Sequence, residues 1–312
     1  MSGHTRARTE AHERWHATAD VVVVGYGYAG AVAAIEAHDV GADGLLIEKM
    51  PDPGGISITS GGNVRIVEDA EEGFRHLQAS NAGTTPDSVL RALAAGMAEI
   101  PAYFGKLARV SGATINQRQA DSNYPFPGSK TFGYVSIDSV PGFDAERTYP
   151  FVSSYLPIHR AAGVRLFKVL QDNICSRRVR VELSTPAIRL ITGAHGEICG
   201  VLAQHDVLLF AIKARRAVVL ACGGFEANSE MQRQYWQEKP VLNAAYMGNT
   251  GDGILMAQAV GAALWHMWHY GVYGFMHPDP AYPFGIRPKR LPDWIPGESS
   301  TRTLRKFRHA RR

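Results

Sequence analysis

The chain has 312 residues and a mass of 34.0 kDa, a size that suits one large domain or two. Its composition, 45% hydrophobic and 20% charged, is that of a globular protein with a sizeable core. The net charge of +4 is uneven, because residues 285–312 contain nine Lys or Arg and two Asp or Glu, whereas the rest is slightly acidic. These features argue against a nucleic-acid-binding protein, and no apolar run reaches the ~18 residues of a membrane span.

The cysteines and the N-terminal segment bear on the compartment. Cys175, Cys199 and Cys222 are too few and too scattered for a disulfide framework or a zinc site, so we expect no metal. Residues 1–19 are polar and lack the apolar segment of a signal peptide. We therefore expect a polar N-terminal tail over 1–19 and a cytoplasmic protein.

The first elements predict a βαβ unit. Residues 20–24 form a β-branched run that ends at a glycine, which is typical of a buried parallel strand. Residues 29–38 have the apolar spacing of a helix, and residues 45–48 are typical of a second strand. The three pieces have about the expected length of ~30 residues. A Gly/Ser-rich stretch without strands follows over 51–63.

The next segment predicts helices separated by an irregular connection. Thr85 is a good N-cap with Pro86 at the first helical position, and Pro101 should begin or kink the next segment. Residues 111–160 carry Gly, Pro, Ser and Tyr with little periodicity, which predicts a long irregular and functional connection. Residues 163–175 have the pattern of a helix.

The following segment predicts several strands. Gly193 and Gly196 mark a turn within it, and residues 217–221 form another buried strand that ends at a double glycine. The four short strand-like runs are 179–183, 187–191, 198–203 and 207–212.

The glycines between the first strand and the first helix indicate a dinucleotide site. Gly25, Gly27 and Gly30 have the GxGxxG spacing, which is weak evidence alone but here has a strand before it and a helix after it. This pattern gives a tight turn, close backbone approach to a pyrophosphate, and close packing of helix on strand. Glu48 ends the next strand and would bind a ribose hydroxyl, while its charge would repel the 2′-phosphate of NADP. The alternative is a glycine turn needed only for packing.

The stretch after Glu48 favours a flavin over a nicotinamide. Gly54-Gly55 and Gly61-Gly62 bracket Ser57 and Ser60, and such a backbone can lie flat against a ligand and donate N–H groups. An isoalloxazine ring needs such a surface, and a nicotinamide cofactor does not. The alternative is a flexible surface loop.

The whole sequence resembles flavoproteins of the fumarate reductase and succinate dehydrogenase type, including 3-ketosteroid dehydrogenases. The matching segments are VVVVGYGYAGAVAA (21–34), LLIEKMPDPGGISITSGGN (45–63), AVVLACGGFEANSEM (217–231) and NTGDGILMAQAVGAAL (249–264). The resemblance implies FAD as the cofactor. It departs at Ile56, where fumarate reductases often have Asn, and at Cys222, where many relatives have Thr.

The resemblance also implies roles along the chain, with the diphosphate at the glycine turn, the adenosine ribose at Glu48, and the adenine beside the backbone of Ala187. Asp252 resembles the late acid that contacts FAD, and it also suits the first turn of a helix over 252–262. The candidate FAD-binding residues are Gly25, Gly27, Ala29, Gly30, Glu48, Lys49, Gly55, Ser57, Gly61, Gly62, Ala187, Cys222, Gly223, Gly224 and Asp252.

Two residues are candidates for proton transfer. His277-Pro278 resembles the His-Pro pair of dicarboxylate reductases, although a few residues later than usual, and an exposed loop histidine is the alternative. Tyr124 lies in a Pro-rich stretch that distantly resembles the tyrosine loop of ketosteroid dehydrogenases, and simple packing is its alternative. No pair of arginines is placed to bind two carboxylates, which favours a ring ketone over a dicarboxylate.

We therefore expect an α/β protein: a Rossmann-like FAD-binding domain over 20–264, with a parallel sheet, helices and an additional β-meander. The start of a capping domain and a basic tail follow over 265–312. The expected activity is hydride transfer between flavin N5 and a C–C bond adjacent to a carbonyl, in a 3-ketosteroid-like or other cyclic ketone. The partners would be an unsaturated carbonyl or ketone substrate and an unidentified electron acceptor or donor.

Three alternatives stay open: fumarate reductase-like dicarboxylate reduction, an NAD-linked dehydrogenase, and an FAD-binding protein with little or no activity. Members of the family continue well beyond this length, so we expect a C-terminally truncated chain that binds FAD weakly and turns over slowly.

Overall fold

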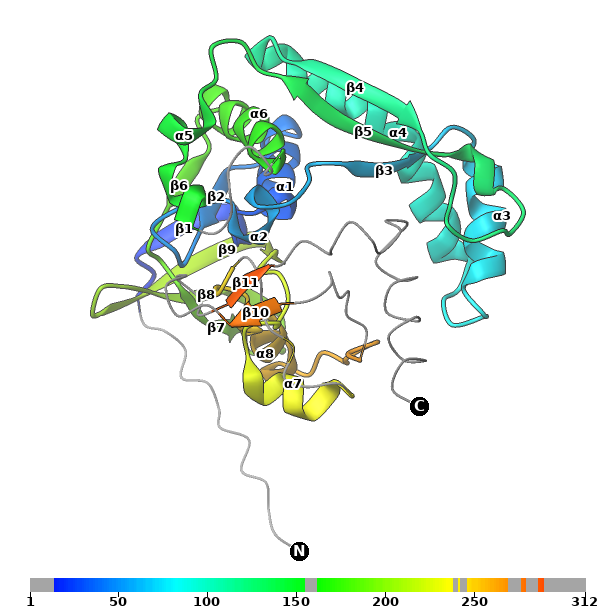
Figure 1. Cartoon of the computed structure of the whole chain (residues 1–312). Helices are drawn as coiled ribbons and strands as arrows, with labels where there is room; N and C mark the ends of the chain where they lie inside the picture. The colour runs from blue at the N-terminus through cyan, green and yellow to red at the C-terminus, as the bar shows by residue number, and fades with distance from the viewer. Residues whose placement is uncertain are drawn as a thin grey trace, which may run out of the picture.

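The computed structural model describes residues 14–154, 162–237, 241, 246–268, 276–278 and 286–288. Its largest sheet has six strands in the order β6-β2-β1-β9-β8-β7 (Figure 1). Their bounds are β1 Ala17–Val24, β2 Gly44–Ile47, β6 Arg180–Glu182, β7 Ala187–Thr192, β8 Ile198–His205 and β9 Leu208–Leu220. The strand expected over 20–24 thus begins earlier, inside the segment predicted to be a polar tail.

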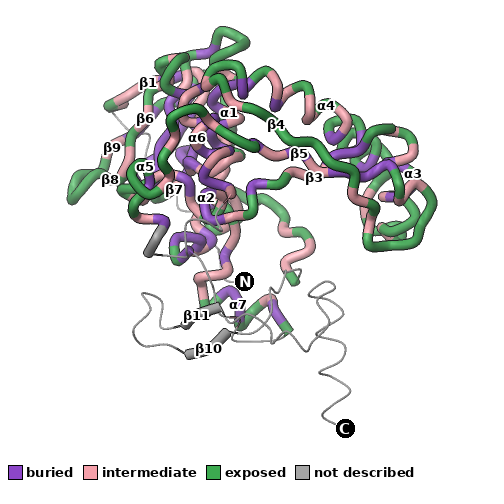
Figure 2. The backbone as a smooth tube through the Cα atoms, turned by 45° about the horizontal axis from the view of Figure 1, so that its top comes forward, coloured by how far each residue is buried: buried purple, intermediate pink, exposed green. Residues whose placement is uncertain are grey.

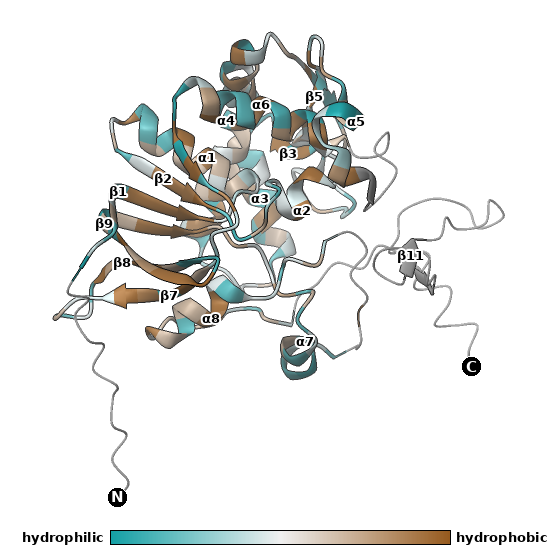
Figure 3. Ribbon diagram, turned by 90° about the vertical axis from the view of Figure 1, so that its left-hand side faces the viewer, coloured by the Kyte–Doolittle hydropathy of each residue, from teal (hydrophilic) through white to brown (hydrophobic). Residues whose placement is uncertain are grey.

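The parallel half of this sheet consists of β6, β2, β1 and β9, and its central strands β1 and β2 are buried on both faces. Val23 packs with the helices α1 (Tyr28–Asp39) and α6 (Gly163–Ser176), whereas its neighbours Val22 and Val24 belong to the cluster on the other face. Burial on both faces explains why β1 ends in an unbroken run of valines, Val21 to Val24. Figure 3 shows β1 largely in the brown of apolar residues.

The antiparallel half is a meander of β7, β8 and β9, as expected. The separate strands expected over 207–212 and 217–221 are, however, one strand, β9, which pairs with β8 along its first part and with β1 further on. The charged residues Lys213, Arg215 and Arg216 do not end it. They are exposed, and Arg215 pairs with Asp20 of β1 at 2.7 Å. Polar side chains on the solvent side of a strand leave its backbone pairing intact.

A second sheet replaces the irregular connection expected over 111–160, and that prediction was wrong. β3 (Val64–Val67), β5 (Phe132–Ser139) and β4 (Thr114–Gln119) pair in the order β3-β5-β4. All six residues of β4 are exposed, so its sequence carries no alternation of buried and exposed positions from which a strand could be inferred. Figure 1 shows this sheet with α3 (Ala70–Ser80) and α4 (Asp87–Ser111) beside the main body.

α4 differs from the expected helix at two points. Its N-cap is Pro86 rather than Thr85, because the extended ψ of 141° at Pro86 lies outside the helical region. The helix also continues through Pro101, where we expected a new segment or a kink. The buried residues Met97 and Phe104 lie on either side of Pro101 and pack into two apolar clusters, which holds the helix to the core across that point.

The remaining described elements are short. Buried residues concentrate around α1, α2 and α6 (Figure 2). None of the helices in the described part of the chain combines the length and hydropathy that a membrane crossing requires. The bounds are α2 Gly55–Ile58, η1 Ser129–Thr131, α5 Ala145–Thr148, η2 Pro150–Ser154, α7 Ser229–Tyr235, α8 Asp252–Ala259, β10 Met276–Pro278 and β11 Ile286–Pro288.

Candidate cofactor site

A pocket of about 580 Å³ lies where β1, β2 and β9 end. Val24 is the last residue of β1, Glu48 follows β2, and Ala221 follows β9, and all three line it. In sheets of this kind, ligands bind in the crevice outside the carboxyl ends of the parallel strands.

The turn from β1 into α1 tolerates no side chain at two of its glycines. Gly25 has φ +105°, and a Cβ there would lie 2.5 Å from the carbonyl oxygen of Ala221. A Cβ at Gly30 would lie 1.8 Å from the carbonyl oxygen of Gly25. The roles expected of these glycines, a tight turn and close packing of helix on strand, are therefore met by the geometry.

The N-terminus of α1 opens on this turn. Gly27 is the N-cap and has no side chain of its own, the first turn contains no acidic residue, and Ser57 Oγ accepts from the N–H of Tyr28. The first N–H groups of a helix lack partners within the helix and carry the positive end of its dipole. Such a terminus is suited to bind an anionic group, a phosphate above all.

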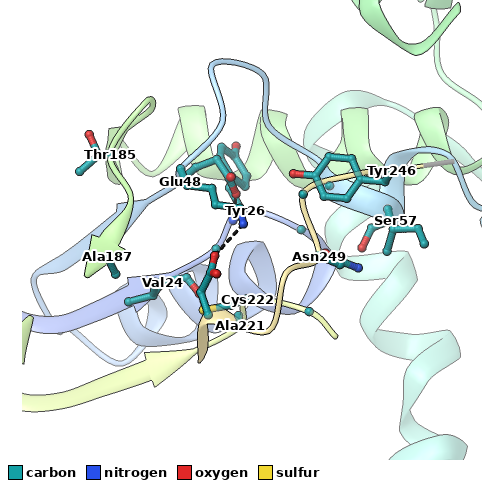
Figure 4. Close-up of a pocket in the computed structure, with 18 of the residues that line it drawn as sticks. Val24, Tyr26, Glu48, Ser57, Thr185, Ala187, Ala221, Cys222, Tyr246 and Asn249 are labelled. Atoms are coloured by element: carbon teal, nitrogen blue, oxygen red, sulfur yellow. Dashed lines mark hydrogen bonds and ion pairs between the residues drawn. The ribbon is translucent and has the colours of Figure 1, made fainter. Parts of the chain in front are cut away.

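Glu48 places a buried carboxylate beside the turn. Its side chain is 6% exposed, and it accepts hydrogen bonds from the backbone N–H groups of Tyr26, at 2.8 Å, and Met50, at 2.9 Å (Figure 4). Each carboxylate oxygen has a second lone pair, so the group can still accept from a hydroxyl of a ligand.

The neighbouring candidate, Lys49, forms an ion pair with another candidate. Its Nζ donates to Asp252 Oδ2 at 2.6 Å and to Thr250 Oγ1 at 2.8 Å, and the Thr250 hydroxyl donates to Asp252 Oδ1 at 2.7 Å. This contact joins the end of β2 to the first residue of α8, more than 200 residues later. The ion pair therefore holds the start of α8 beside Lys49, where both residues line the pocket.

The double glycine after β9 makes room for polar side chains. Gly223 has φ +74°, and a Cβ there would lie 2.7 Å from Asn249 Oδ1. A Cβ at Gly224 would lie 2.7 Å from Glu226 Oε2. Asn249 and Glu226 are hydrogen-bonded to each other, so this double glycine accommodates a side-chain pair at the pocket wall.

Cys222 is a partly buried thiol. Its Sγ donates to the carbonyl of Val24 at 3.4 Å. Burial, with the charges of Asp252 and Glu48, raises its pKa to about 11. The thiol is therefore neutral near pH 7 and unsuited to act as a nucleophile.

α2 lies at the opposite end of the pocket from Thr185 and Ala187. Ser57 Oγ accepts from the backbone N–H of Tyr28 at 3.3 Å, and the Tyr246 ring lies near Gly55. Figure 4 shows Thr185 and Ala187 on one side, Glu48 in the middle, and Ser57 and Tyr246 on the other.

The structure brings most of the expected cofactor residues to this pocket. The lining ones are Gly25, Gly27, Glu48, Lys49, Gly55, Ser57, Ala187, Cys222, Gly223 and Asp252. Outside the lining lie Ala29 and Gly30 in α1, Gly224 beside Glu226, the exposed Gly61, and Gly62, which packs against Ala162. Sequence reasoning missed Val24, Tyr26, Ile56, Thr185, Ala221, Tyr246, Gly248, Asn249 and Met256.

Of the two proton-transfer candidates, Tyr124 is not among the described lining residues. Tyr124 is 60% exposed, in the connection between β4 and β5, where its ring stacks on Phe126. His277 lies in β10, paired with Arg287 of β11, and its side chain is outside the described part of the structure.

The arrangement fits FAD. Between Ala187 and Ser57, at opposite ends of the pocket, lie a buried carboxylate that can accept from a hydroxyl and a helix N-terminus that suits an anionic group (Figure 4). A side chain at Gly25 would meet the backbone on which this cradle depends. The residues present are therefore those that a dinucleotide requires.

Comparison with known proteins gives relatives that include fumarate reductases and steroid dehydrogenases. The chain is 28% identical over 265 residues to an NADH:fumarate oxidoreductase of Klebsiella pneumoniae, with 84% of this chain and 27% of the relative covered. It is also 28% identical over 313 residues to a 3-oxosteroid 1-dehydrogenase of Mycobacterium tuberculosis, with 78% and 54% covered. The chain thus spans about half or less of the length of these relatives.

The fold is shared with solved structures. A 3-ketosteroid-Δ4-(5α)-dehydrogenase of Rhodococcus jostii, in complex with 4-androstene-3,17-dione, matches with a TM-score of 0.67 and 25% identity, over 82% of this chain and 56% of that one. The family profile described as FAD binding domain matches residues 20–288. The chain therefore belongs to the FAD binding domain family, and its cofactor is FAD.

Proposed function

We propose that this chain belongs to an FAD-dependent oxidoreductase that transfers a hydride between flavin N5 and a C–C bond adjacent to a carbonyl. The observation that carries the proposal is the pocket itself, where the N-terminus of α1 and the buried carboxylate of Glu48 lie side by side. Both kinds of relative are named for redox reactions, of fumarate and of 3-oxosteroids. We favour a 3-ketosteroid-like or other cyclic ketone, which the steroid-dehydrogenase relatives support.

The residues of this chain would bind and orient the cofactor. The turn from Gly25 to Gly30, with Ala29 in the first turn of α1, would bind the diphosphate. Glu48 would accept from the adenosine ribose, Ala187 would border the adenine, and Ser57 would face the flavin. When bound, FAD supplies the hydride acceptor or donor.

The proton of the neighbouring carbon needs a separate group. His277 and Tyr124 remain our candidates, and Tyr124 would have to be reached by a substrate outside the described pocket, because its side chain is exposed on the β4–β5 connection. We further propose that residues 20–264 form the FAD-binding domain and that 265–312 begin a capping domain.

The proposal includes two partners and a compartment. The partners are a small ketone or unsaturated carbonyl compound, and an electron acceptor or donor that returns the flavin to its starting redox state in each turnover. A cytoplasmic location is supported by three cysteines that are all free in the structure.

The test is a binding titration followed by a redox assay. The purified chain, stripped of flavin, is expected to bind FAD at a stoichiometry of about one, with loss of flavin fluorescence, and to bind NAD far more weakly. A chain that binds NAD but not FAD would refute the proposal. Reoxidation of the photoreduced, FAD-loaded chain by an α,β-unsaturated 3-ketosteroid, whose C=C accepts the hydride, or by fumarate then distinguishes a ring-ketone substrate from a dicarboxylate.

A further inference from the structure

Asn249, like Thr185, is a buried polar residue at the pocket that sequence reasoning did not find. It lines the pocket and is 6% exposed. Its Nδ2 donates to Glu226 Oε1 at 2.6 Å. Figure 4 places Asn249 between Cys222 and Ser57, on the side of the pocket away from Thr185 and Ala187.

Glu226 determines which end of the Asn249 amide is engaged and which end is left for a ligand. A carboxylate accepts hydrogen bonds and has no proton to donate, whereas an amide offers one donor end and one acceptor end. Glu226 therefore requires the NH₂ end of Asn249, and the Oδ1 end must turn the other way. Among the residues that the structure describes, none donates a hydrogen bond to Oδ1.

The backbone around the amide is also held. The N–H of Ala227 donates to the carbonyl of Asn249 at 2.9 Å, and the N–H of Gly251 donates to the carbonyl of Gly224 at 3.0 Å. From the other side, Lys49 binds Thr250 and Asp252. The acceptor is thus preorganised, which reduces the conformational entropy that a ligand hydrogen bond would cost.

The double glycine gives room for this arrangement. A side chain at Gly223 would collide with the Asn249 amide, and one at Gly224 would collide with the Glu226 carboxylate. The Gly-Gly pair therefore leaves space for both partners of the hydrogen bond.

We propose that Asn249 Oδ1 accepts a hydrogen bond from a hydroxyl of the ribityl chain of FAD and that Glu226 is a positioning residue that sets the orientation of this amide. The inference rests on the proposed function. A phosphate oxygen is excluded as the partner because it is itself an acceptor. The ribityl chain is the hydroxyl-bearing part of FAD beyond the diphosphate, on the side where Asn249 lies, whereas Glu48 faces the adenosine ribose.

The test compares FAD with ADP, which lacks the ribityl chain and the flavin. Asn249→Leu removes the acceptor and is expected to raise the Kd for FAD about 3- to 10-fold, the effect of one hydrogen bond. The Kd for ADP should change less than about twofold. ADP binding also reports that the variant is folded.

An exchange of the two side-chain chemistries tests the positioning role. Asn249→Asp alone brings two carboxylates together and should weaken FAD binding. Glu226→Gln alone lets the amide turn either way and should weaken it less. In the double variant, the amide at 226 donates to the carboxylate at 249, which still offers an acceptor to the pocket at unchanged net charge. We expect the ratio of the Kd for FAD to the Kd for ADP to return to within about twofold of wild type.

Two results would overturn the inference: equal weakening of FAD and ADP by Asn249→Leu, or a double variant no better than Asn249→Asp alone. A wild-type chain that binds neither nucleotide would instead refute the proposed function. That result is distinct from a chain that binds both and shows no FAD-specific loss.

Discussion

Gly30→Ala perturbs the closest contact between α1 and the turn that precedes it. The new Cβ would lie 1.8 Å from the carbonyl oxygen of Gly25 and 3.0 Å from its carbonyl carbon. Both are backbone atoms, which cannot rotate away as the end of a side chain can. The helix must therefore move away from the turn, or the turn must open.

The magnitude follows from two opposing effects. Replacing a helical glycine by alanine favours the helix by about 1 kcal/mol, whereas overpacking costs about 1–3 kcal/mol or more, and a contact of 1.8 Å belongs at the upper end of that range. We expect Gly30→Ala to lower the free energy of unfolding by about 2 kcal/mol. Gly96→Ala is the matched control, because Gly96 is also helical, lies exposed in α4, and has no atom within 4 Å of its added Cβ. It should stabilise by up to about 1 kcal/mol.

Urea denaturation followed by tryptophan fluorescence measures both changes, and a titration with FAD measures the consequence for the site. Because the displaced turn carries Gly25 and Gly27, Gly30→Ala should weaken FAD binding at least about tenfold, and Gly96→Ala should leave it unchanged. If the two variants were equally stable and bound FAD alike, the close packing of α1 on the turn could not be the reason for a glycine at position 30.

Three further predictions concern the polar groups of the pocket. Glu48→Gln sets an NH₂ group against one of the two backbone N–H donors, those of Tyr26 and Met50. We therefore expect a loss of about 1–3 kcal/mol in the free energy of unfolding, measured by urea denaturation. A variant as stable as wild type would contradict this prediction. Asp252→Asn breaks the ion pair with Lys49, whose side chains are 26% (Lys49) and 37% (Asp252) exposed. The loss in the free energy of unfolding should therefore stay below about 1 kcal/mol and vanish in roughly 1 M salt. Urea midpoints of both proteins at low salt and at high salt measure this difference. Burial raises the pKa of Cys222 to about 11, so its reactive thiolate is scarce at pH 8 and increases as the pH rises towards 11. Iodoacetamide followed by mass spectrometry should therefore modify the exposed Cys175 well before Cys222 at pH 8, and equal rates would refute the effect of burial.

Some elements of the fold could be predicted from the local sequence, because their form depends on nearby residues alone. The valine run of β1 stops at Gly25, the helix α1 has apolar residues at helical spacing, and the strand β2 is followed by Glu48. Each of these elements could therefore be predicted from its own sequence. The turn between them was predictable for the same reason, since Gly25 and Gly30 are required by contacts with nearby backbone. Glu48 followed from its place at the end of β2, and the structure puts it in the pocket.

Other features depended on contacts between distant segments. β4 is exposed throughout and becomes a strand because β5 pairs with it. β9 is continuous because β8 and β1 pair with successive parts of it, whatever its charged residues suggest locally.

The pocket wall shows the same division. The glycine turn after β1 and the acid after β2 could be recognised from the sequence, because nearby backbone leaves no room for side chains in the turn and Glu48 directly follows its strand. Only the folded structure shows that Asn249 lines the pocket with its amide held by Glu226, and that Lys49 pairs with Asp252 across more than 200 residues. Such contacts depend on how the chain returns to the sheet, and no local pattern of side chains encodes that return.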